Sequence, residues 1–300
     1  MNTLSKSYFL LSLFILLFSA TQAQNIPDST MRKIKNFRAV YETMGKVYPP
    51  DSTVSVDATE IAGVKTYWFN QNLLNQNHLI IYLHGGVYTY GNIHAYQAMV
   101  SRLAKEFHLP ILYVEYSLSP EHQFPTANNE ILGVYRQIQK KYPNHEITLI
   151  GDSAGGGLAV SLVKDAIKAS LPLPSSLALI SPWIDLECTN KSYETKQAVD
   201  PILSKKFLYD HALLYAPNKI KEADPSEIKF TKFPPVLLLV GTDEVLNDDS
   251  KNFYAAIKPI QKNAKLKEFD GQKHVWVFSH IASKASMEAV SDIKKFINAF

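Results

Sequence analysis

Short apolar runs alternate along the chain with longer segments whose apolar residues recur at helical spacing. The runs at 78–83, 111–116 and 236–240 contain few polar residues, which is typical of parallel strands buried on both faces. Segment 31–46 instead shows the three-to-four-residue recurrence of an amphipathic helix. The full set of predicted strands is 54–57, 64–69, 78–83, 111–116, 146–150, 177–180, 236–240 and 265–269, and the predicted helices are 31–46, 93–107, 127–142, 154–169, 204–215 and 286–300.

Strands and helices alternate over most of the chain, and this order predicts an α/β fold. Such an order favours a mostly parallel central sheet with helices on both faces. The alternation is interrupted at 183–232, where no strand-like run occurs and one helix is expected near 204–215. An insertion of about 50 residues is long for a connection inside a compact domain, and functional lids are a common reason. We therefore expect a small cap over the carboxyl edge of the sheet.

Composition and charge exclude several classes of protein and of site. The 300 residues are 46% hydrophobic and 20% charged, which is an ordinary globular balance. The net charge of +3, without a long run of one sign, gives no reason to expect a nucleic-acid partner. Cys188 is the single cysteine, so neither an intramolecular disulfide nor a cysteine-based zinc site can form. No cluster of metal-ligand type stands out, and we expect no metal or cofactor.

The first 23 residues have the pattern of a secretory signal peptide. Lys6 is followed by an apolar run of 11 residues at 8–18, and small and polar residues then lead to Ala23. A membrane-spanning helix needs about 17–25 apolar residues, so this run is short for a span. We expect cleavage after Ala23, no stable membrane span afterwards, and a periplasmic or secreted protein. An uncleaved N-terminal anchor is the alternative.

Two glycine-rich motifs follow predicted strands and indicate the chemistry. The first in importance is Gly151-Asp-Ser-Ala-Gly155, which comes after the strand at 146–150 and opens the helix at 154–169. This context is that of a nucleophile elbow, in which a serine occupies a strained turn between strand and helix. We therefore predict that Ser153 is a nucleophile. A plain packing turn with a solvated serine is the alternative.

The second motif, His84-Gly85-Gly86, directly follows the strand at 78–83. Attack on an acyl group creates an oxyanion, which preorganised backbone N–H groups must stabilise. Glycines after a strand allow that close approach, and the residue after the nucleophile, Ala154, supplies a further donor. For His84 we expect a structural role, in which the ring holds the loop by hydrogen bonds.

A nucleophilic serine needs a histidine base and a carboxylate that orients the base. His211, His274 and His280 follow Ser153, and His274 is favoured because it lies on a loop just after the strand at 265–269. Asp243 lies just past the end of the strand at 236–240 and is the predicted acid. The neighbouring carboxylates Glu244, Asp248 and Asp249 are expected instead to cap the helix that begins near Asn247.

These motifs together resemble those of the bacterial hormone-sensitive-lipase-like esterases of the α/β-hydrolase superfamily, over about residues 80–278. The resemblance implies a triad of Ser153, Asp243 and His274. It also implies an α/β-hydrolase domain at 24–300 whose helical cap comes from about 24–50 and from 183–232. The oxyanion hole implied comprises the backbone N–H groups of Gly85, Gly86, Val87 and Ala154. The motifs that carry the resemblance are His84-Gly-Gly86, Glu115-Tyr-Ser-Leu-Ser-Pro-Glu-His-Gln-Phe-Pro125, Gly151-Asp-Ser-Ala-Gly-Gly156, Ser181-Pro-Trp-Ile-Asp-Leu186, Asp200-Pro-Ile-Leu-Ser204, Gly241-Thr-Asp-Glu-Val-Leu246 and His274-Val-Trp276.

Two positions depart from the family pattern. Val87 stands where a third glycine or an alanine is usual, and its branched side chain should narrow the loop and the acyl site. Ser117 replaces an arginine, so an ion pair is expected to be missing.

The predicted reaction is hydrolysis of carboxylic esters of short to medium acyl chain through an acyl-enzyme. The expected partner is a small-molecule ester, and the oligomeric state stays open. Cleavage of amides, peptides or lactones by the same triad is an alternative, because a fold does not determine its substrate. A non-catalytic secreted binding protein of the same fold is a second alternative. Aromatic residues that could line the pocket, or simply pack in the core, are Tyr88, Tyr90, Trp183, Phe207 and Tyr215.

Overall fold

The computed structural model describes residues 26–300, so the predicted signal peptide lies outside the described residues. The chain divides into two compact units, Met1–Phe37 and Arg38–Phe300. The described part of the first unit contains the beginning of helix α2 (Asp28–Met44). The second unit contains the end of α2 and all the remaining helices and strands.

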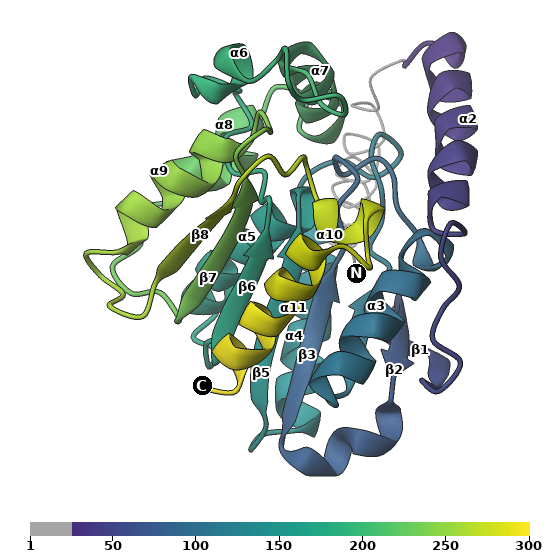
Figure 1. Cartoon of the computed structure of the whole chain (residues 1–300), viewed down its shortest axis with the longest axis vertical. Helices are drawn as coiled ribbons and strands as arrows, with labels where there is room; N and C mark the ends of the chain where they lie inside the picture. Colours follow the sequence, from purple (N-terminus) through teal and green to yellow (C-terminus); the bar gives the residue numbers. More distant parts are fainter. Residues whose placement is uncertain (1–25) are drawn as a thin grey trace, which may run out of the picture. The chain divides into compact units, whose positions relative to one another are not determined.

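An eight-stranded sheet forms the centre of the second unit (Figure 1). The spatial order of the strands is β1-β2-β4-β3-β5-β6-β7-β8. The β1/β2 and β2/β4 pairs are antiparallel and the other five are parallel, which confirms the predicted mostly parallel sheet. The strands are β1 (Val56–Ile61), β2 (Val64–Phe69), β3 (His78–Leu83), β4 (Ile111–Val114), β5 (Glu146–Asp152), β6 (Ser176–Ile180), β7 (Val236–Gly241) and β8 (Lys265–Phe269).

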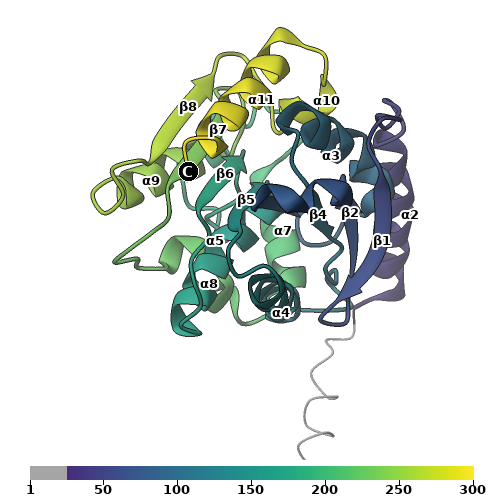
Figure 2. The same ribbon diagram turned by 90° about the horizontal axis from the view of Figure 1, so that it is seen from below.

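Helices cover both faces of the sheet, as the alternation of elements predicts. Figures 1 and 2 show α3 and α11 on one face and α4 and α5 on the other. The main helices of this unit are α3 (Ile93–Phe107), α4 (Thr126–Lys141), α5 (Ala154–Lys168), α7 (Lys205–Tyr215), α9 (Asn247–Ile257) and α11 (Lys284–Ile297). The short ones are η1 (Gln71–Gln76), α6 (Ser192–Thr195), α8 (Ile220–Ala223), η2 (Pro225–Glu227) and α10 (Trp276–Ser279).

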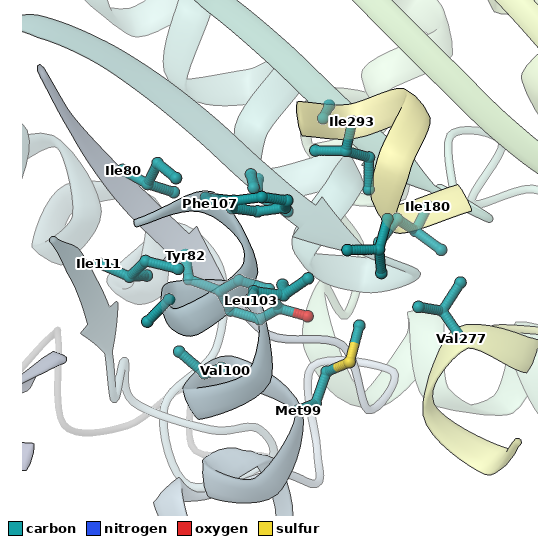
Figure 3. Close-up of a cluster of buried hydrophobic side chains, with 14 of the residues drawn as sticks. Ile80, Tyr82, Met99, Val100, Leu103, Phe107, Ile111, Ile180, Val277 and Ile293 are labelled. Carbon is teal, nitrogen blue, oxygen red and sulfur yellow. The ribbon is translucent and has the colours of Figure 1, made fainter. Parts of the chain in front are cut away.

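A large apolar cluster lies between the sheet and the pair α3 and α11 (Figure 3). Tyr82 and Ile180 from the strands meet Met99 and Leu103 from α3 and Ile293 from α11, and all five side chains are buried. Burial of each such side chain contributes roughly 1.5–3 kcal/mol relative to leaving it in water. This cluster supports the strands whose carboxyl ends carry the motifs.

The insertion predicted at 183–232 contains helices but no strand, as expected. Figure 1 shows α6 and α7 beyond the carboxyl ends of the central strands. The edge strand predicted at 54–57 is shifted, because β1 begins at Val56 and pairs with β2 through the turn at Ala62 and Gly63, both at positive φ. Within residues 26–300, no helix is long and apolar enough to cross a membrane.

Candidate active site

Ser153 occupies a strained turn between β5 and α5. Its backbone has φ 50° and ψ −122°, a conformation that a residue with a side chain rarely adopts. The turn is tight enough to require glycine nearby. A Cβ on Gly155 would overlap the carbonyl oxygen of Leu83, and one on Gly151 would overlap the backbone of Gly155. The strand–turn–helix geometry therefore presents Ser153 as the sequence predicts for an elbow.

A continuous hydrogen-bond chain joins a serine, a histidine and a carboxylate. The Ser153 Oγ atom lies 3.1 Å from Nε2 of His274. The Nδ1 atom of the same ring lies 2.9 Å from Oε2 of Glu244. The Glu244 side chain is fully buried, and its Oε1 accepts the Gly241 N–H at 2.6 Å and the Ser181 hydroxyl at 2.8 Å. Hydrogen bonds to Oε1 thus fix the orientation of the carboxylate, and Oε2 contacts the imidazole.

The structure corrects the predicted acid. Asp243 does not contact His274. Its Oδ2 instead forms an ion pair with Nζ of Lys273 at 2.9 Å, and its side chain is 31% exposed. The turn after Gly241 directs Asp243 outward and Glu244 inward. Two adjacent carboxylates after one strand cannot be ranked by their distance from the strand, so the sequence offered no sound basis for preferring the first.

The other two neighbouring aspartates are not helix caps, which corrects a second expectation. Helix α9 begins at Asn247 as predicted, but its N-cap residue is Leu246, which makes no side-chain cap, and the Asp248 N–H donates instead to the Ser192 hydroxyl. The Oδ2 atom of Asp249 accepts the backbone N–H groups of Ile184 and Asp185, and Asp248 accepts that of Ser192. Both carboxylates therefore hold the segment that follows β6.

The remaining histidines lie apart from this chain of contacts. His211 on α7 uses Nδ1 to contact the Phe207 carbonyl and Nε2 to contact the Tyr90 hydroxyl at 2.9 Å. Burial lowers the pKa of His211, which favours a neutral ring with a hydrogen bond on each nitrogen. His280 contacts the Ser279 hydroxyl next to it. Of the three histidines considered, only His274 reaches Ser153.

The loop after β3 contains three consecutive residues at positive φ. Gly86, Val87 and Tyr88 have φ values of 106°, 49° and 60°.

The backbone N–H groups predicted as oxyanion donors fall into two groups. The Gly85 N–H already donates to Oδ1 of Asp152 at 3.0 Å, so Gly85 is corrected from a free donor to an anchored one. The backbone N–H groups of Gly86, Val87 and Ala154 donate to no other residue in the described part of the chain.

His84 is buried and stacks on the Tyr116 ring with the centroids 4.2 Å apart. Its Nδ1 lies 2.7 Å from the Gly85 carbonyl, and burial lowers its pKa to about 4. The ring is therefore neutral near pH 7, and its Nδ1 contacts the carbonyl of the next residue in the same loop. A Cβ on Gly91 would overlap this ring, which explains why a glycine closes the loop.

Arg38 anchors the far side of the same loop. Its guanidinium donates to the Thr89 and Ser119 carbonyls and binds Glu121 through both Nη atoms at 2.8 Å.

Ser117, which stands in place of an arginine, donates its N–H and its hydroxyl to the two oxygens of Glu130 at 2.7 and 2.6 Å. Hydrogen bonds from Ser117 thus engage both oxygens of the Glu130 carboxylate.

Three of the aromatic residues singled out in the sequence form one buried group beside Ser153. The rings of Tyr88 and Tyr215 stack with centroids 3.8 Å apart, and Trp183 packs on Tyr88 at 5.5 Å. The Trp183 backbone N–H donates to the Ser153 carbonyl at 2.9 Å, which holds this group next to the elbow. The other two, Tyr90 and Phe207, pack instead around His211.

The chain belongs to the alpha/beta hydrolase fold family, which matches residues 80–278. It is 27% identical to an esterase of Acinetobacter venetianus over 98% of this chain and 97% of that protein. It is 33% identical to an acetyl-hydrolase of Streptomyces hygroscopicus over 67% of this chain and 69% of that one. The crystal structure of an esterase from the bacterial hormone-sensitive lipase family superimposes with a TM-score of 0.83 at 29% identity, covering 89% of this chain and 91% of that one. The predicted resemblance is confirmed, and the protein is a carboxylesterase-type hydrolase.

Proposed function

We propose that Ser153, His274 and Glu244 form a catalytic triad that hydrolyses carboxylic esters through an acyl-enzyme. His274 Nε2 accepts the Ser153 proton while Oγ attacks the ester carbonyl carbon. The oxygen of that carbonyl becomes the oxyanion of a tetrahedral intermediate. The imidazolium then gives its proton to the departing alcohol, and an ester to Ser153 remains. A water molecule then gives a proton to His274 while its oxygen attacks the acyl carbon. The acyl–Oγ bond breaks, Oγ takes the proton back from the imidazolium, and the carboxylic acid leaves.

The observation that carries this proposal is the pair of contacts on His274. One ring nitrogen contacts a serine at a strained elbow, and the other contacts a fully buried carboxylate. The N–H groups of Gly86, Val87 and Ala154, with no partner inside residues 26–300, supply the oxyanion donors beside it. Backbone donors of this kind are already oriented before the charge develops, so they stabilise the transition state without reorganisation.

Labelling of the purified protein with a fluorophosphonate tests this proposal. We expect stoichiometric modification of Ser153, together with turnover of aryl esters. A matched panel of esters, amides and lactones with the same acyl group distinguishes an esterase from an amidase, peptidase or lactonase. A protein that neither labels nor turns over any member of the panel would be a binding protein of the same fold, and the proposal would fail.

Short acyl groups are the proposed substrates. Val87, a donor of the hole, is a buried β-branched residue, and the neighbouring Tyr88 is stacked against Tyr215 and Trp183. These rings occupy space beside Ser153 that a long acyl chain would need. The relative from Streptomyces hygroscopicus is named an acetyl-hydrolase, which agrees with a small acyl site.

We also propose that the insertion at 183–232, with about 24–50, acts as the cap. A further proposal is that the N-terminal leader exports the chain to the periplasm or the medium.

Replacement of Val87 is expected to change chain-length preference more than catalysis. In the wild type, kcat/KM for aryl esters should be highest for acetyl or propionyl, because longer chains must pass the two valine methyl groups. Val87→Gly should extend the usable length while acetyl-ester kcat stays within about threefold, since the backbone N–H remains. Val87→Ala is the matched control, because it removes the methyl groups but keeps the Cβ that restrains the backbone. A wild-type optimum at octanoyl or longer, or the same profile in all three proteins, would contradict this prediction.

A further inference from the structure

Asp152 precedes the nucleophile and makes contacts that the triad does not require. Its side chain is 2% exposed and lies at the end of β5. The Oδ1 atom accepts the Gly85 N–H at 3.0 Å and the Tyr82 hydroxyl at 2.8 Å, and Oδ2 accepts the Tyr96 hydroxyl at 3.1 Å. Three donors from two other elements and one loop therefore converge on a single buried carboxylate.

Gly85 follows His84 in the loop after β3 that contains the proposed oxyanion donors Gly86 and Val87, called the oxyanion loop below. It lies directly against the elbow. A Cβ on Gly85 would overlap the Asp152 carboxylate and would come within 2.9 Å of the Cβ of Ser153. The close approach requires glycine, and it brings the loop and the nucleophile together through one side chain. Asp152 is bonded covalently to Ser153 on one side and hydrogen-bonded to the oxyanion loop on the other.

We propose that Asp152 is a positioning residue that sets the distance between the Ser153 nucleophile and the oxyanion donors of Gly86 and Val87. Productive geometry at such a site is held to within about 0.5 Å, which a strained loop cannot guarantee by itself. The loop residues Gly86, Val87 and Tyr88 are at positive φ, so their conformation persists only if neighbouring groups hold it. By binding the N–H that precedes these donors, Asp152 fixes the start of the loop and leaves the next two N–H groups for substrate.

Tyrosines hold the Asp152 carboxylate in turn. Tyr82 comes from β3, and its ring is embedded in the apolar cluster of Figure 3. Tyr96 comes from α3, and its hydroxyl lies 2.9 Å from that of Tyr41. Burial raises the pKa of Asp152 to about 6, so the group is predominantly a carboxylate near pH 7 and can accept all three hydrogen bonds. Burial and donors together leave this carboxylate little freedom to move.

Replacement of Asp152 tests the proposal. Asp152→Ala removes the acceptor for Gly85, and we expect kcat for an acetyl aryl ester to fall by about 10²–10³ with KM within threefold, as when an oxyanion donor is lost. Asp152→Asn can keep its carbonyl oxygen on Gly85 and Tyr82 and turn its amide to Tyr96, so we expect kcat within about tenfold of wild type. Each kcat is expressed per site labelled to completion by fluorophosphonate, so that misfolded protein is not counted.

Inhibition by an aryl trifluoromethyl ketone provides a second readout. Attack by Ser153 gives a tetrahedral adduct whose oxygen occupies the oxyanion hole, so Ki should rise in parallel with the fall in kcat/KM. A purely structural role would lower the melting temperature and leave kcat per labelled site and Ki unchanged. If Asp152→Ala yields kcat per labelled site within twofold of wild type, or if Asp152→Asn is as impaired as Asp152→Ala, the proposal is overturned.

Three tyrosine variants keep the test decisive if Asp152→Ala does not fold. Tyr82→Phe and Tyr96→Phe each remove one hydroxyl from Asp152, and we expect kcat to fall about threefold to tenfold. Tyr113→Phe is the matched control, because this buried hydroxyl on β4 has no hydrogen-bond partner among the residues described. Equal kcat in all three variants would contradict the proposal. This inference rests on the proposed function, and the wild-type protein distinguishes failure of one from failure of the other. If fluorophosphonate does not label the wild type, the proposed function fails. If the wild type is active and the variants are unaffected, only the role of Asp152 is overturned.

Discussion

Ser153→Ala is expected to reduce ester turnover by about 10⁶ in kcat and to abolish fluorophosphonate labelling. Loss of a triad nucleophile in a serine hydrolase has an effect of this size, because no other group can form the acyl-enzyme. Among residues 26–300, the Ser153 hydroxyl is the hydrogen-bond partner of His274 Nε2. The measurement is single-turnover and steady-state hydrolysis of an acetyl aryl ester, with mass spectrometry of the labelled protein.

The fold should survive this change. Ser153 has φ 50°, and alanine carries the same Cβ, so the backbone strain at the elbow is unaltered. The Ser153 backbone bonds to Ile180 and Trp183 do not involve the hydroxyl and remain. We therefore expect a melting temperature within a few degrees of wild type, because the change removes the hydroxyl contact to His274 and one hydrogen bond contributes about 1 kcal/mol. A folded variant that still forms a covalent adduct would show that the nucleophile lies elsewhere.

Glu244→Gln is expected to lower kcat by about 10⁴ with little change in KM. The Oε1 position must stay an acceptor, because it receives the Gly241 N–H and the Ser181 hydroxyl. The glutamine carbonyl therefore occupies that position and its amide nitrogen faces His274 Nδ1. An amide donor there forces Nδ1 to accept and places the ring proton on Nε2, where it cannot take the proton of Ser153. The wrong tautomer of a triad histidine has a cost of this order.

Asp243→Asn is the matched control, because it changes the adjacent residue in the same chemical way. Asp243 contacts Lys273 at the surface, and exposed ion pairs of this kind contribute about 0–1 kcal/mol. We expect kcat within about twofold of wild type. We would measure the pH dependence of kcat/KM for both variants and the wild type. It distinguishes an effect on the base His274 from an effect on the stability of the fold. A loss of 10⁴ in Asp243→Asn with near-normal Glu244→Gln would reverse the assignment of the acid.

The site shows which kinds of question a single sequence can answer. The strands at 64–69, 78–83 and 265–269 and the helix at 93–107 have the bounds that the sequence predicts. The sequence also predicts the serine and the histidine that the structure brings into contact, because each has a local signature: a glycine-flanked turn after a strand, and a loop just beyond the last strand. Hydrophobic runs and glycine spacing are properties of neighbouring residues, so they can be recognised without the fold.

The partner of each hydrogen bond depends on the positions of single atoms, which patterns of hydrophobic residues and glycines do not specify. Asp243 and Glu244 are adjacent and chemically alike, and the direction of each side chain depends on the turn after β7 and on the Ser181 and Gly241 groups that donate hydrogen bonds to a carboxylate there. Gly85 and Gly86 are identical residues, yet the Gly85 N–H donates to Asp152, whereas the Gly86 N–H donates to no residue in the described part of the chain.

The sequence by itself therefore determined the α/β architecture and the places of the serine at the elbow and of the histidine after the last strand, since these follow from local hydrophobic runs and from the glycines that a tight turn demands. Only the tertiary structure decided which carboxylate contacts His274, which backbone N–H groups of the loop after β3 have no partner in the described part of the chain, and what Asp152 binds. Those assignments depend on atoms from segments far apart in the chain, such as Gly85 and Asp152, which are brought within about 3 Å by the pairing of β3 with β5. A hydrogen bond requires that proximity and an angle, and neither is encoded in the identity of the residue.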